Sequence, residues 1–598
     1  GHTLAGVGGG QFYYDPDDST SADNNGTVIV TSSGERWKRG YELEINPTMF
    51  GADSNGILDS TIAFQNALDA NGHVKTKKGE TYLLSGIEIS DSYIIEGDGL
   101  LQSKGDNHLI IANGASGFSI TVNANGAGAN YSGLLITGCT DFSVSGCSLD
   151  SFGEAIGFQS AIKIEGVSRR FSIVNNTCIN GLGETAADIS LGHDPSEAIV
   201  SGNRCLSPNS EGITIQPTTG DKIVRATVSN NLCSGHTRHG IIGVYANAKP
   251  VEVSITGNVC VNNGWTGIYM QGQLAGVGTN SGRATISGNI VSECGGDDTS
   301  VLFNSGIYLS GDLGYTCFGN MIVNTCRDKL GVEKSMSGRG IFISNLSNAV
   351  VTSNVVTNTF GSGIFGDGAK LDGLIIGDNI VKDSTITNIR LEIQGAGNIS
   401  RLVNIHDNML KSSEYDCAGI RLSTTSTAEW RGFSIKGNKI QGEKLSTNEK
   451  GIEITAATNA LLSGEVLYNE ITNYDFGVYK EGAQSHLYGV KGLVIKDNIF
   501  RFCGNALTIQ SGSSNWSIVD KQIFESCDVD FNGTWQKRGT ITASGNALLF
   551  DTSKPAFAAW AAGDKVENTN PSSSGYAGWV CVSSGTPGTW KGYGLIET

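Results

Sequence analysis

Proline is scarce in this 598-residue sequence, and basic residues are outnumbered by acidic ones. The chain has 9 Pro, and 41 Lys and Arg stand against 58 Asp and Glu, so its formal net charge is −17. Nucleic acid and anionic membrane surfaces both bind clustered Lys and Arg, so the net negative charge of the chain disfavours them as partners. No apolar run reaches the roughly eighteen residues of a membrane-spanning helix, and no signal peptide opens the chain. We therefore expect no nucleic acid partner and no membrane insertion.

Metal-binding cysteine motifs are also missing. The 13 Cys include no Cys-x-x-Cys pair and no His/Cys cluster, so we expect no metal and no cofactor. Cys178, Cys205, Cys233 and Cys260 recur at one repeated position, which is typical of reduced, buried, small apolar side chains. His236 and His239 lie three residues apart without an evident third ligand, and we interpret them as exposed sugar contacts.

Between residues 130 and 530 the sequence has no apolar residues at the three-and-four spacing of a helix. An asparagine returns there every 25 to 34 residues, in blocks such as SGNRCL, TGNVCV and KDNIFR. This period predicts a solenoid. The repeated positions are Asn176, Asn203, Asn231, Asn258, Asn289, Asn320, Asn354, Asn379, Asn408, Asn438, Asn469 and Asn498.

A second repeated block follows each asparagine and contains Gly-Ile, as in EGITIQ, TGIYMQ and KGIEIT. Both blocks alternate polar and apolar residues, so both are predicted strands. The 82 Gly suit tight turns between such strands. If the coils stack in parallel, each asparagine amide can bond its neighbour and the turn backbone, which satisfies buried polar groups along the stack.

The composition predicts four regions. Residues 1–45 are a neck or linker, and residues 46–94 form a cap leading into the coils. In this cap we expect a helix over Thr61–Leu68 that is capped by Ser60 and buries an apolar face including Ile62 and Phe64. Such a helix covers the open first edge of the stack. Residues 95–534 are the coils, and residues 535–598, with Trp535, Trp560, Trp579 and Trp590, form a small β domain for trimerisation or carbohydrate binding.

Three sequence segments carry a family resemblance. FGADSNGILDSTIAFQNAL followed by the coil blocks resembles the entry of pectate-lyase-like right-handed β-helices. DNNGTVIVTSSGERWKR and AGWVCVSSGTPGTWKGYG resemble the neck and tail of phage tailspikes and capsular polysaccharide depolymerases. The resemblance implies an all-β, right-handed parallel β-helix, assembled as a homotrimer in the virion tail. It also implies a bacterial capsular or O-antigen polysaccharide as substrate. Gly1 and His2 look like remnants of a removed tag, so we expect a further N-terminal region that contacts other tail proteins.

The residue after each Gly-Ile block is predicted to point outward. This column has an aromatic in four successive blocks, and we expect these rings, Trp265 before one block, and nearby cationic side chains to contact sugar. The predicted substrate-binding residues are Trp265, Tyr269, Tyr308, Phe342, Phe365, Arg339 and His239.

Glycoside hydrolysis needs one protonated and one ionised carboxyl group. Long loops beside the aromatic column carry acids, so we expect the catalytic pair there. The candidates, in order, are Asp298, Glu333, Asp312, Asp367, Asp297 and Glu211. We place Glu392 on the aromatic column, with its Cα about 8 Å from that of Asp367, a spacing that favours inversion.

Two other functions stay open. A polysaccharide lyase would need a base and a cation, for which Arg339, His239, Tyr269 and Tyr308 are available. Alternatively, the protein is an adhesin that binds the polymer without cutting it.

Overall fold

The structure is a computed structural model. It describes residues 8–40, 44–105, 107–129, 131–153, 159–181, 187–208, 210–216, 223–245, 249–272, 282–295, 304–311, 314–326, 338–412, 417–425, 428–443, 448–455, 462–481, 493–509, 518–520, 522–533, 538–541, 547–551, 553–554, 560–585 and 588–597. The chain divides into two compact units, residues 1–298 and 299–598, which are described separately.

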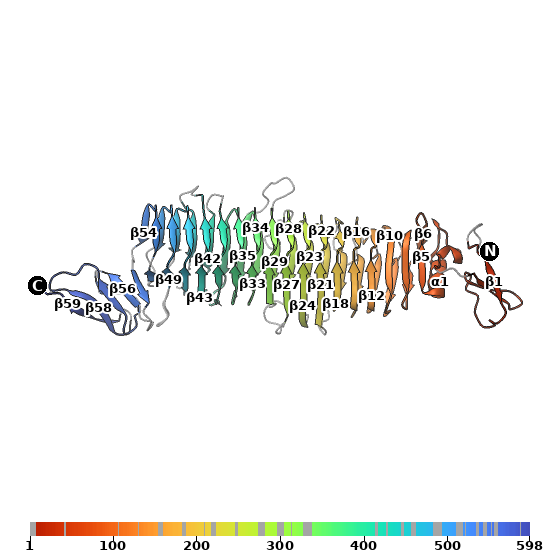
Figure 1. Cartoon of the computed structure of the whole chain (residues 1–598), viewed down its shortest axis with the longest axis horizontal. Coiled ribbons are helices and arrows are strands. Elements are labelled where there is room, and N and C mark those ends of the chain that lie inside the picture. The colour runs from red at the N-terminus through yellow and green to blue at the C-terminus, as the bar shows by residue number, and fades with distance from the viewer. Residues whose placement is uncertain are drawn as a thin grey trace. The chain divides into compact units, whose positions relative to one another are not determined.

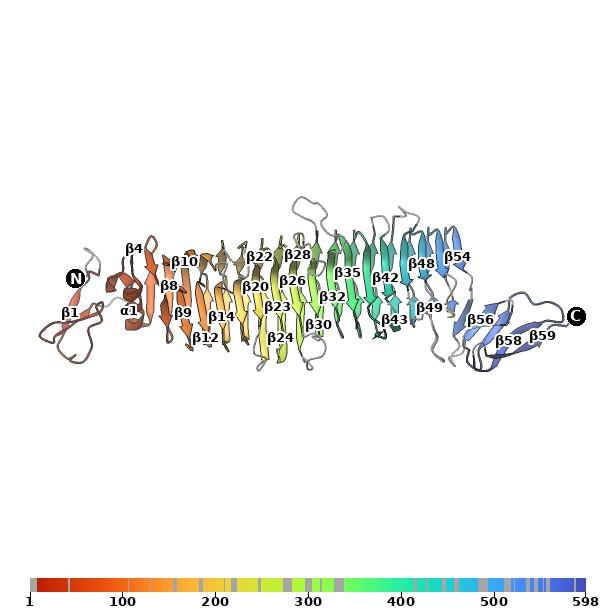
Figure 2. The same ribbon diagram turned by 180° about the vertical axis from the view of Figure 1, so that it is seen from behind.

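In both units the chain winds into parallel coils that build two kinds of sheet (Figures 1 and 2). The GI sheet takes one strand per coil and contains the Gly-Ile blocks. The ladder sheet takes two strands from most coils and three from the coil that contains residues 399–411, and the repeated asparagine lies in the turn before the last strand of the coil. Neighbouring strands within each sheet are parallel, as the sequence predicts.

The GI sheet strands alternate between an inward isoleucine and an outward side chain. In the first unit they are β7 (Ile87–Ile89), β9 (Ile110–Asn113), β11 (Leu134–Thr137), β14 (Ser160–Glu165), β17 (Ala187–Gly192), β20 (Glu211–Gln216), β23 (His239–Val244) and β26 (Thr266–Gln271). In the second unit they are β29 (Ser305–Ser310), β32 (Gly338–Ser344), β35 (Gly361–Gly368), β38 (Thr387–Ile393), β42 (Ala418–Thr424), β45 (Lys450–Thr455), β48 (Phe476–Glu481), β51 (Asn505–Ile509) and β54 (Val529–Gly533).

In each coil the ladder sheet strand that follows the asparagine turn is no longer than the strand before it. In the first unit they are β4 (Asn55–Asp59), β5 (His73–Thr76), β6 (Thr81–Leu84), β8 (Ile94–Ser103), β10 (Ser119–Ala129), β12 (Thr140–Ser145), β13 (Ser148–Phe152), β15 (Arg169–Val174), β16 (Thr177–Ile179), β18 (Ser196–Ser201), β19 (Arg204–Cys205), β21 (Ile223–Ser229), β22 (Leu232–Ser234), β24 (Lys249–Thr256), β25 (Val259–Val261), β27 (Arg283–Ser287) and β28 (Ile290–Ser292). In the second unit they are β30 (Gly314–Phe318), β31 (Met321–Val323), β33 (Val350–Thr352), β34 (Val355–Thr357), β36 (Ile375–Gly377), β37 (Ile380–Lys382), β39 (Ile399–Arg401), β40 (Asn404–His406), β41 (Met409–Lys411), β43 (Glu429–Lys436), β44 (Lys439–Gln441), β46 (Leu462–Leu467), β47 (Glu470–Thr472), β49 (Leu493–Lys496), β50 (Ile499–Arg501), β52 (Ile518–Asp520) and β53 (Ile523–Glu525).

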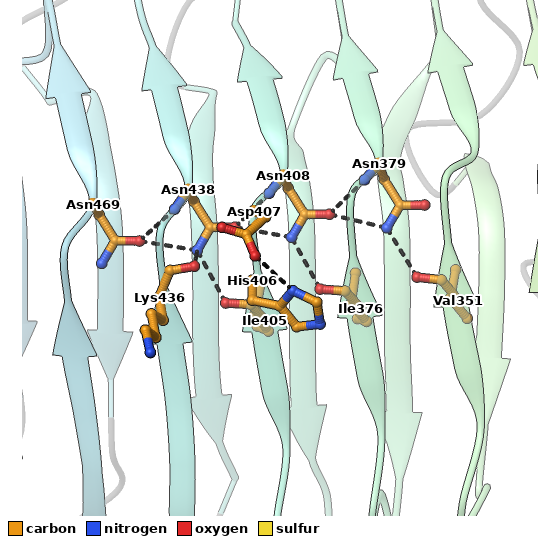
Figure 3. A network of polar contacts seen from close by, with 10 residues as sticks. All are labelled: Val351, Ile376, Asn379, Ile405, His406, Asp407, Asn408, Lys436, Asn438 and Asn469. Carbon is orange, nitrogen blue, oxygen red and sulfur yellow. Dashed lines mark hydrogen bonds and ion pairs between the residues drawn. The ribbon is translucent and has the colours of Figure 1, made fainter.

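The repeated asparagines form the predicted ladder of hydrogen bonds. Asn408 is buried; its Nδ2 donates to Asn438 Oδ1 at 2.9 Å and to the Ile376 carbonyl oxygen at 3.0 Å. Its own Oδ1 accepts from the backbone N–H of Asn379 at 3.0 Å and from Asn379 Nδ2 at 2.9 Å. Figure 3 shows the same pattern continuing through neighbouring coils. Each amide therefore satisfies its own polar atoms and the turn backbone without water.

The repeated cysteines also occupy the predicted interior position. Cys178, Cys205, Cys233 and Cys260 lie in register on β16, β19, β22 and β25, and all four are fully buried free thiols. Burial raises the pKa of the Cys178 thiol well above its usual range, which keeps it protonated. These cysteines act as small apolar side chains in the core.

A short helix precedes the coils, and two details of its prediction are wrong. Helix α1 (Thr61–Asn71) packs against the 3₁₀ helix η1 (Pro47–Phe50), β5 and β7, with Phe64 buried as expected. Ile62 is instead 77% exposed, because only one side of the helix faces the coils. The Ser60 hydroxyl does not cap the helix; it bonds the Asp53 and Leu58 backbone, while Asp59 accepts from the Thr61 N–H.

Small sheets lie at the two ends of the sequence. In the first unit, β1 (Phe12–Asp15), β2 (Val28–Val30) and β3 (Arg36–Arg39) form an antiparallel sheet in the order β1-β3-β2. In the second unit, β55 (Arg538–Ile541), β56 (Ala547–Asp551), β57 (Lys565–Asn568), β58 (Tyr576–Ser583) and β59 (Thr589–Leu595) form a mainly antiparallel sheet. Trp560 is buried against Trp590 there.

The predicted fold class is confirmed: the residues that the structure describes are mostly β, with parallel coils, one short α-helix and a small C-terminal sheet. In the part of the chain that the structure describes, no helix is long and apolar enough to cross a membrane.

Candidate functional site

The GI sheet of the second unit carries an outward column of aromatic and cationic side chains. Tyr308, Phe342, Phe365 and Arg390 are register partners on β29, β32, β35 and β38. Arg390, and not Glu392, therefore follows the aromatics in this column. The expectation failed because Asn388 replaces the glycine of the Gly-Ile block, and the alignment slipped by two residues along the strand.

The aromatic rings of this column pack on one another. The ring centroids of Tyr308 and Phe342 are 4.9 Å apart, and those of Phe342 and Phe365 are 5.4 Å apart. The Arg339 guanidinium lies 4.1 Å from the Phe342 centroid and 4.9 Å from that of Phe365, while Arg390 lies 5.2 Å from Phe365. Such contacts are cation–π interactions.

The prediction that these rings are exposed is wrong. Phe342 is 2% and Phe365 6% exposed, and Tyr308 is half-buried. Coil spacing brings each ring within stacking distance of the next, and Arg339 lies over two of them. The column therefore forms a packed layer beside the site, in which Arg339 is 9% exposed and Arg390 is half-buried.

Two carboxylates lie next to this aromatic column. Asp367 and Glu392 are direct register partners on β35 and β38, two residues beyond the column. Directly paired parallel strands place their Cα atoms roughly 4.8 Å apart. The expected Cα separation of about 8 Å between Asp367 and Glu392 is therefore wrong, because the alignment was shifted by two residues along β38.

The environments of the two carboxyl groups differ. Burial is the main cause that raises the pKa of Asp367 above 3.8, and the negative charge of Glu392 adds to it. A hydrogen bond with Ser344 and the charge of Arg339 oppose this rise. Glu392 instead forms an ion pair with Arg390, with Oε2 2.7 Å from Nη2. The pKa of Asp367 is thus raised by burial, while Glu392 is held in an ion pair with Arg390.

The GI sheet of the first unit carries a second polar cluster. Glu211 Oε1 lies 3.2 Å from Arg238 Nη1, and the Arg238 guanidinium lies 4.3 Å from the Trp265 ring centroid. Burial raises the pKa of Glu211, against the effect of Arg238. Trp265 is half-buried and Tyr269 is 6% exposed, so Tyr269 is not the open platform that the sequence predicted.

The two histidines of this region are not exposed sugar contacts. His236 and His239 are each 1% exposed. His236 Nε2 lies 3.2 Å from the Cys205 carbonyl oxygen, and the His239 ring packs 4.8 Å from that of Tyr269. Burial lowers the pKa of His239 to about 3, so its imidazole is neutral near pH 7. His236 contacts the Cys205 backbone, whereas His239 is buried on the GI sheet beside Tyr269 and Trp265.

The described residues include only some of the predicted acids. Asp297, Asp298, Asp312 and Glu333 lie outside the described residues. Asp367 and Glu211 belong to different units, and each is described with its own neighbours. Arg390 and Ser344 also belong to the Asp367 site, although neither was among the predicted site residues. If Asn388–Ile389 is aligned with the Gly-Ile blocks, Arg390 falls beside Phe365, as it does in the structure. Within the described ranges, no group of three or more His, Cys, Asp or Glu residues is placed to hold a metal ion.

A parallel β-helix with paired carboxylates on its outer surface defines the class of this protein. Residues 218–405 match the family model described as a right handed beta helix region. Residues 1–42 match the model described as a phage tail protein small four-stranded beta-sheet domain. The two matches thus identify a domain like that of phage tail proteins at residues 1–42 and a right-handed β-helix region at residues 218–405.

Several solved structures are similar to this chain at low identity. The enzymatically active domain of bacteriophage CBA120 tailspike protein 2 is 14% identical, with 77% of this chain and 54% of that chain covered and a TM-score of 0.27. The chain therefore spans about half the length of that domain. Bacteriophage CBA120 tailspike protein 3 is 13% identical over 93% of this chain and 70% of that chain, with a TM-score of 0.39.

A bacterial exopolygalacturonase, from Thermotoga maritima, is 11% identical over 67% of this chain and 92% of that chain, with a TM-score of 0.39. At these identities and TM-scores, none of the three structures is evidence for an activity or a substrate of this chain.

Proposed function

We propose that this protein is a glycoside hydrolase that cuts a bacterial surface polysaccharide, a capsule or an O-antigen, from the tail of a phage virion. The observation that carries the proposal is the register pair of Asp367 and Glu392, which differ in their environments. The tail location is supported by the match of residues 1–42 to a phage tail domain.

In this mechanism Asp367 is the general acid. Its raised pKa favours the protonated form that must donate to the leaving glycosidic oxygen. Ser344 and Arg339 position the carboxyl group and limit the rise of its pKa.

Glu392 is the ionised partner, acting as a nucleophile or as the base that activates water. Its ion pair with Arg390 fixes its orientation. Retaining enzymes hold their two carboxyl groups about 5 Å apart, and inverting enzymes about 6.5 to 9.5 Å apart. The direct pairing of β35 with β38 favours the shorter separation, and hence retention.

The experiment compares the protein with three variants on polysaccharide from the phage host. We expect the chain length to fall and reducing ends to appear with the parent protein. Asp367→Asn and Glu392→Gln should each lower kcat at least 100-fold, because each removes one of the two essential groups. Asp378→Asn is the matched control, since Asp378 is an exposed carboxylate on an asparagine turn of the same unit.

Mass spectrometry of the products separates hydrolysis from elimination. Hydrolysis adds water to each cleaved bond, whereas a lyase leaves an unsaturated uronate that absorbs in the ultraviolet. Unsaturated ends would contradict the proposal, and an unchanged polymer would indicate an adhesin. Full activity of Asp367→Asn would exclude this site as the catalytic one.

We also propose that the protein is a homotrimer that joins other tail proteins of the virion. This assembly was expected from the tailspike resemblance, and the phage tail match at residues 1–42 supports the connection to the tail. Light scattering should give three times the chain mass of 62.7 kDa. A mass of one chain would contradict the trimer without affecting the catalytic assignment.

A further inference from the structure

A groove on the ladder sheet of the second unit gathers basic side chains in an otherwise acidic protein. It has a volume of about 450 Å³ and lies across β37, β41, β44, β47 and β50. Lys382, Lys411, Lys439 and Arg501 line it, and Glu470 is the one acidic side chain in its lining. The chain as a whole carries a net charge of −17, so this local excess of positive charge is unusual.

Strand register brings two of these lysines directly opposite each other. Lys382 and Lys411 are partners on β37 and β41, so their Cα atoms are roughly 4.8 Å apart. Like charges in direct cross-strand contact are destabilising. An anion bound between the two ammonium groups would offset this repulsion.

The lysines differ in their existing partners. Lys411 Nζ lies 3.6 Å from Glu443 Oε1. Lys382 and Lys439 make no ion pair with any residue that the structure describes. Lys439 is exposed and Lys382 is half-buried, so both ammonium groups are available to a ligand.

Apolar surface accompanies the charges. Met409 is 48% exposed and lies in register with Lys439 on the next strand. At the far side of the groove, Arg501 forms ion pairs with Glu470 and Glu525, which hold its guanidinium in place. The groove therefore places Lys382 and Lys439 beside an apolar patch, while Arg501 at its far side is already paired with two glutamates.

We infer that this groove is an accessory binding site for an acidic oligosaccharide, a segment of polymer that carries carboxylate groups. Lys382 and Lys439 would bind the carboxylates, and Met409 would contact the apolar face of a sugar ring. The groove is short and the chain is acidic, which disfavours a long nucleic acid that needs an extended basic surface. The inference goes beyond the proposed function, because the site lies on the ladder sheet and does not include the Asp367 pair.

The test measures binding by calorimetry, with oligogalacturonate as the acidic probe and maltohexaose as the neutral one. Asp367→Asn serves as the background, so that cleavage at the proposed catalytic site cannot contribute. We expect binding of the acidic probe alone, weakened at high salt. Lys382→Gln with Lys439→Gln should weaken it at least tenfold. Lys591→Gln is the matched control, an exposed lysine on β59.

A second variant tests whether the loss of binding comes from the lost charges and not from a loss of structure. Lys382→Arg with Lys439→Arg keeps both charges and should retain binding within a few fold. Equal affinity in the double Gln variant, or equal binding of maltohexaose, would overturn the inference. Comparable binding of inorganic polyphosphate would also overturn it, because the groove would then be a general polyanion site. A change in oligomeric mass of the double Gln variant would identify the groove as a contact between copies of the chain instead.

Discussion

At the scale of single residues, the proposed catalysis depends on the environment of one carboxyl group. Burial and the neighbouring Glu392 raise the pKa of Asp367, whereas Ser344 and Arg339 lower it. An acid catalyst is active only while protonated, so the rate should fall as the pH rises through this pKa.

Replacing Ser344 should therefore move the alkaline limb of the pH–rate profile. Ser344→Ala removes a hydrogen bond that favours the ionised form of Asp367, so the pKa rises further and the limb moves to higher pH. Measuring kcat from pH 3 to 9 checks this. A limb that stays in place, or moves to lower pH, would argue against Asp367 as the acid.

The buried histidines make a prediction about stability. Burial lowers the pKa of His236 to about 4 and that of His239 to about 3, from 6.5. The unfolded chain therefore binds protons at a higher pH than the folded chain does. Their contribution to stability is complete above pH 6.5 and is lost as the pH falls, down to about 4 for His236 and about 3 for His239.

His239→Phe keeps a ring beside Tyr269 but removes the titrating group. We expect its thermal midpoint to fall less between pH 7 and pH 5 than that of the parent protein. The difference between the two proteins at pH 8, where the histidines are neutral, reports the packing change together with the lost hydrogen bond to the Thr266 backbone. An identical pH dependence in both proteins would contradict the assignment.

At the scale of the repeated elements, the asparagine ladder is a main source of order in the coils. Asn408→Ala removes an acceptor for two groups of Asn379 and a donor for the Ile376 carbonyl. Each buried group left without a partner costs about 1–3 kcal/mol, so we expect a loss of several kcal/mol in the free energy of unfolding. Urea unfolding checks this, with the exposed turn residue Asn570→Ala as the control. Equal losses in the two variants would show that the ladder contributes little.

The coil architecture could be predicted from the sequence because period, strand alternation and buried amides are local in each repeat. The site could be predicted only in part. Asn388 broke the Gly-Ile pattern, so Glu392 was placed two residues from its true register, although on the correct face. Ring burial depends on neighbours from other coils, such as Arg339 over Phe365, and no single repeat contains that information.

Part of the basic groove could also be predicted from the asparagine repeat. Lys382 and Lys411 each stand three residues after a ladder asparagine, Asn379 and Asn408. Equal offsets on consecutive coils place side chains in one column. The predicted site residues came from the column after the Gly-Ile blocks, and none came from this lysine column.

At the scale of the whole molecule, the cysteines predict a simple chemical result. All 13 are free thiols, 12 are buried, and Cys527 is partly accessible. A thiol reagent such as dithionitrobenzoate should label about one cysteine per folded chain and all 13 after denaturation. Rapid labelling of several thiols in the native protein would contradict the buried cysteine column, and fewer than 13 after denaturation would indicate disulfides.

The asparagine ladder also bears on how such a protein can change its length. Asn408 bonds only to the asparagines of the coils immediately before and after it, and to the backbone of those coils. Removing or duplicating one entire coil would join two equivalent bonding partners, whereas removing part of a coil would leave an amide without its neighbour. Insertions and deletions in the coil region should therefore be inherited in whole coils, so that related chains differ in length by discrete steps.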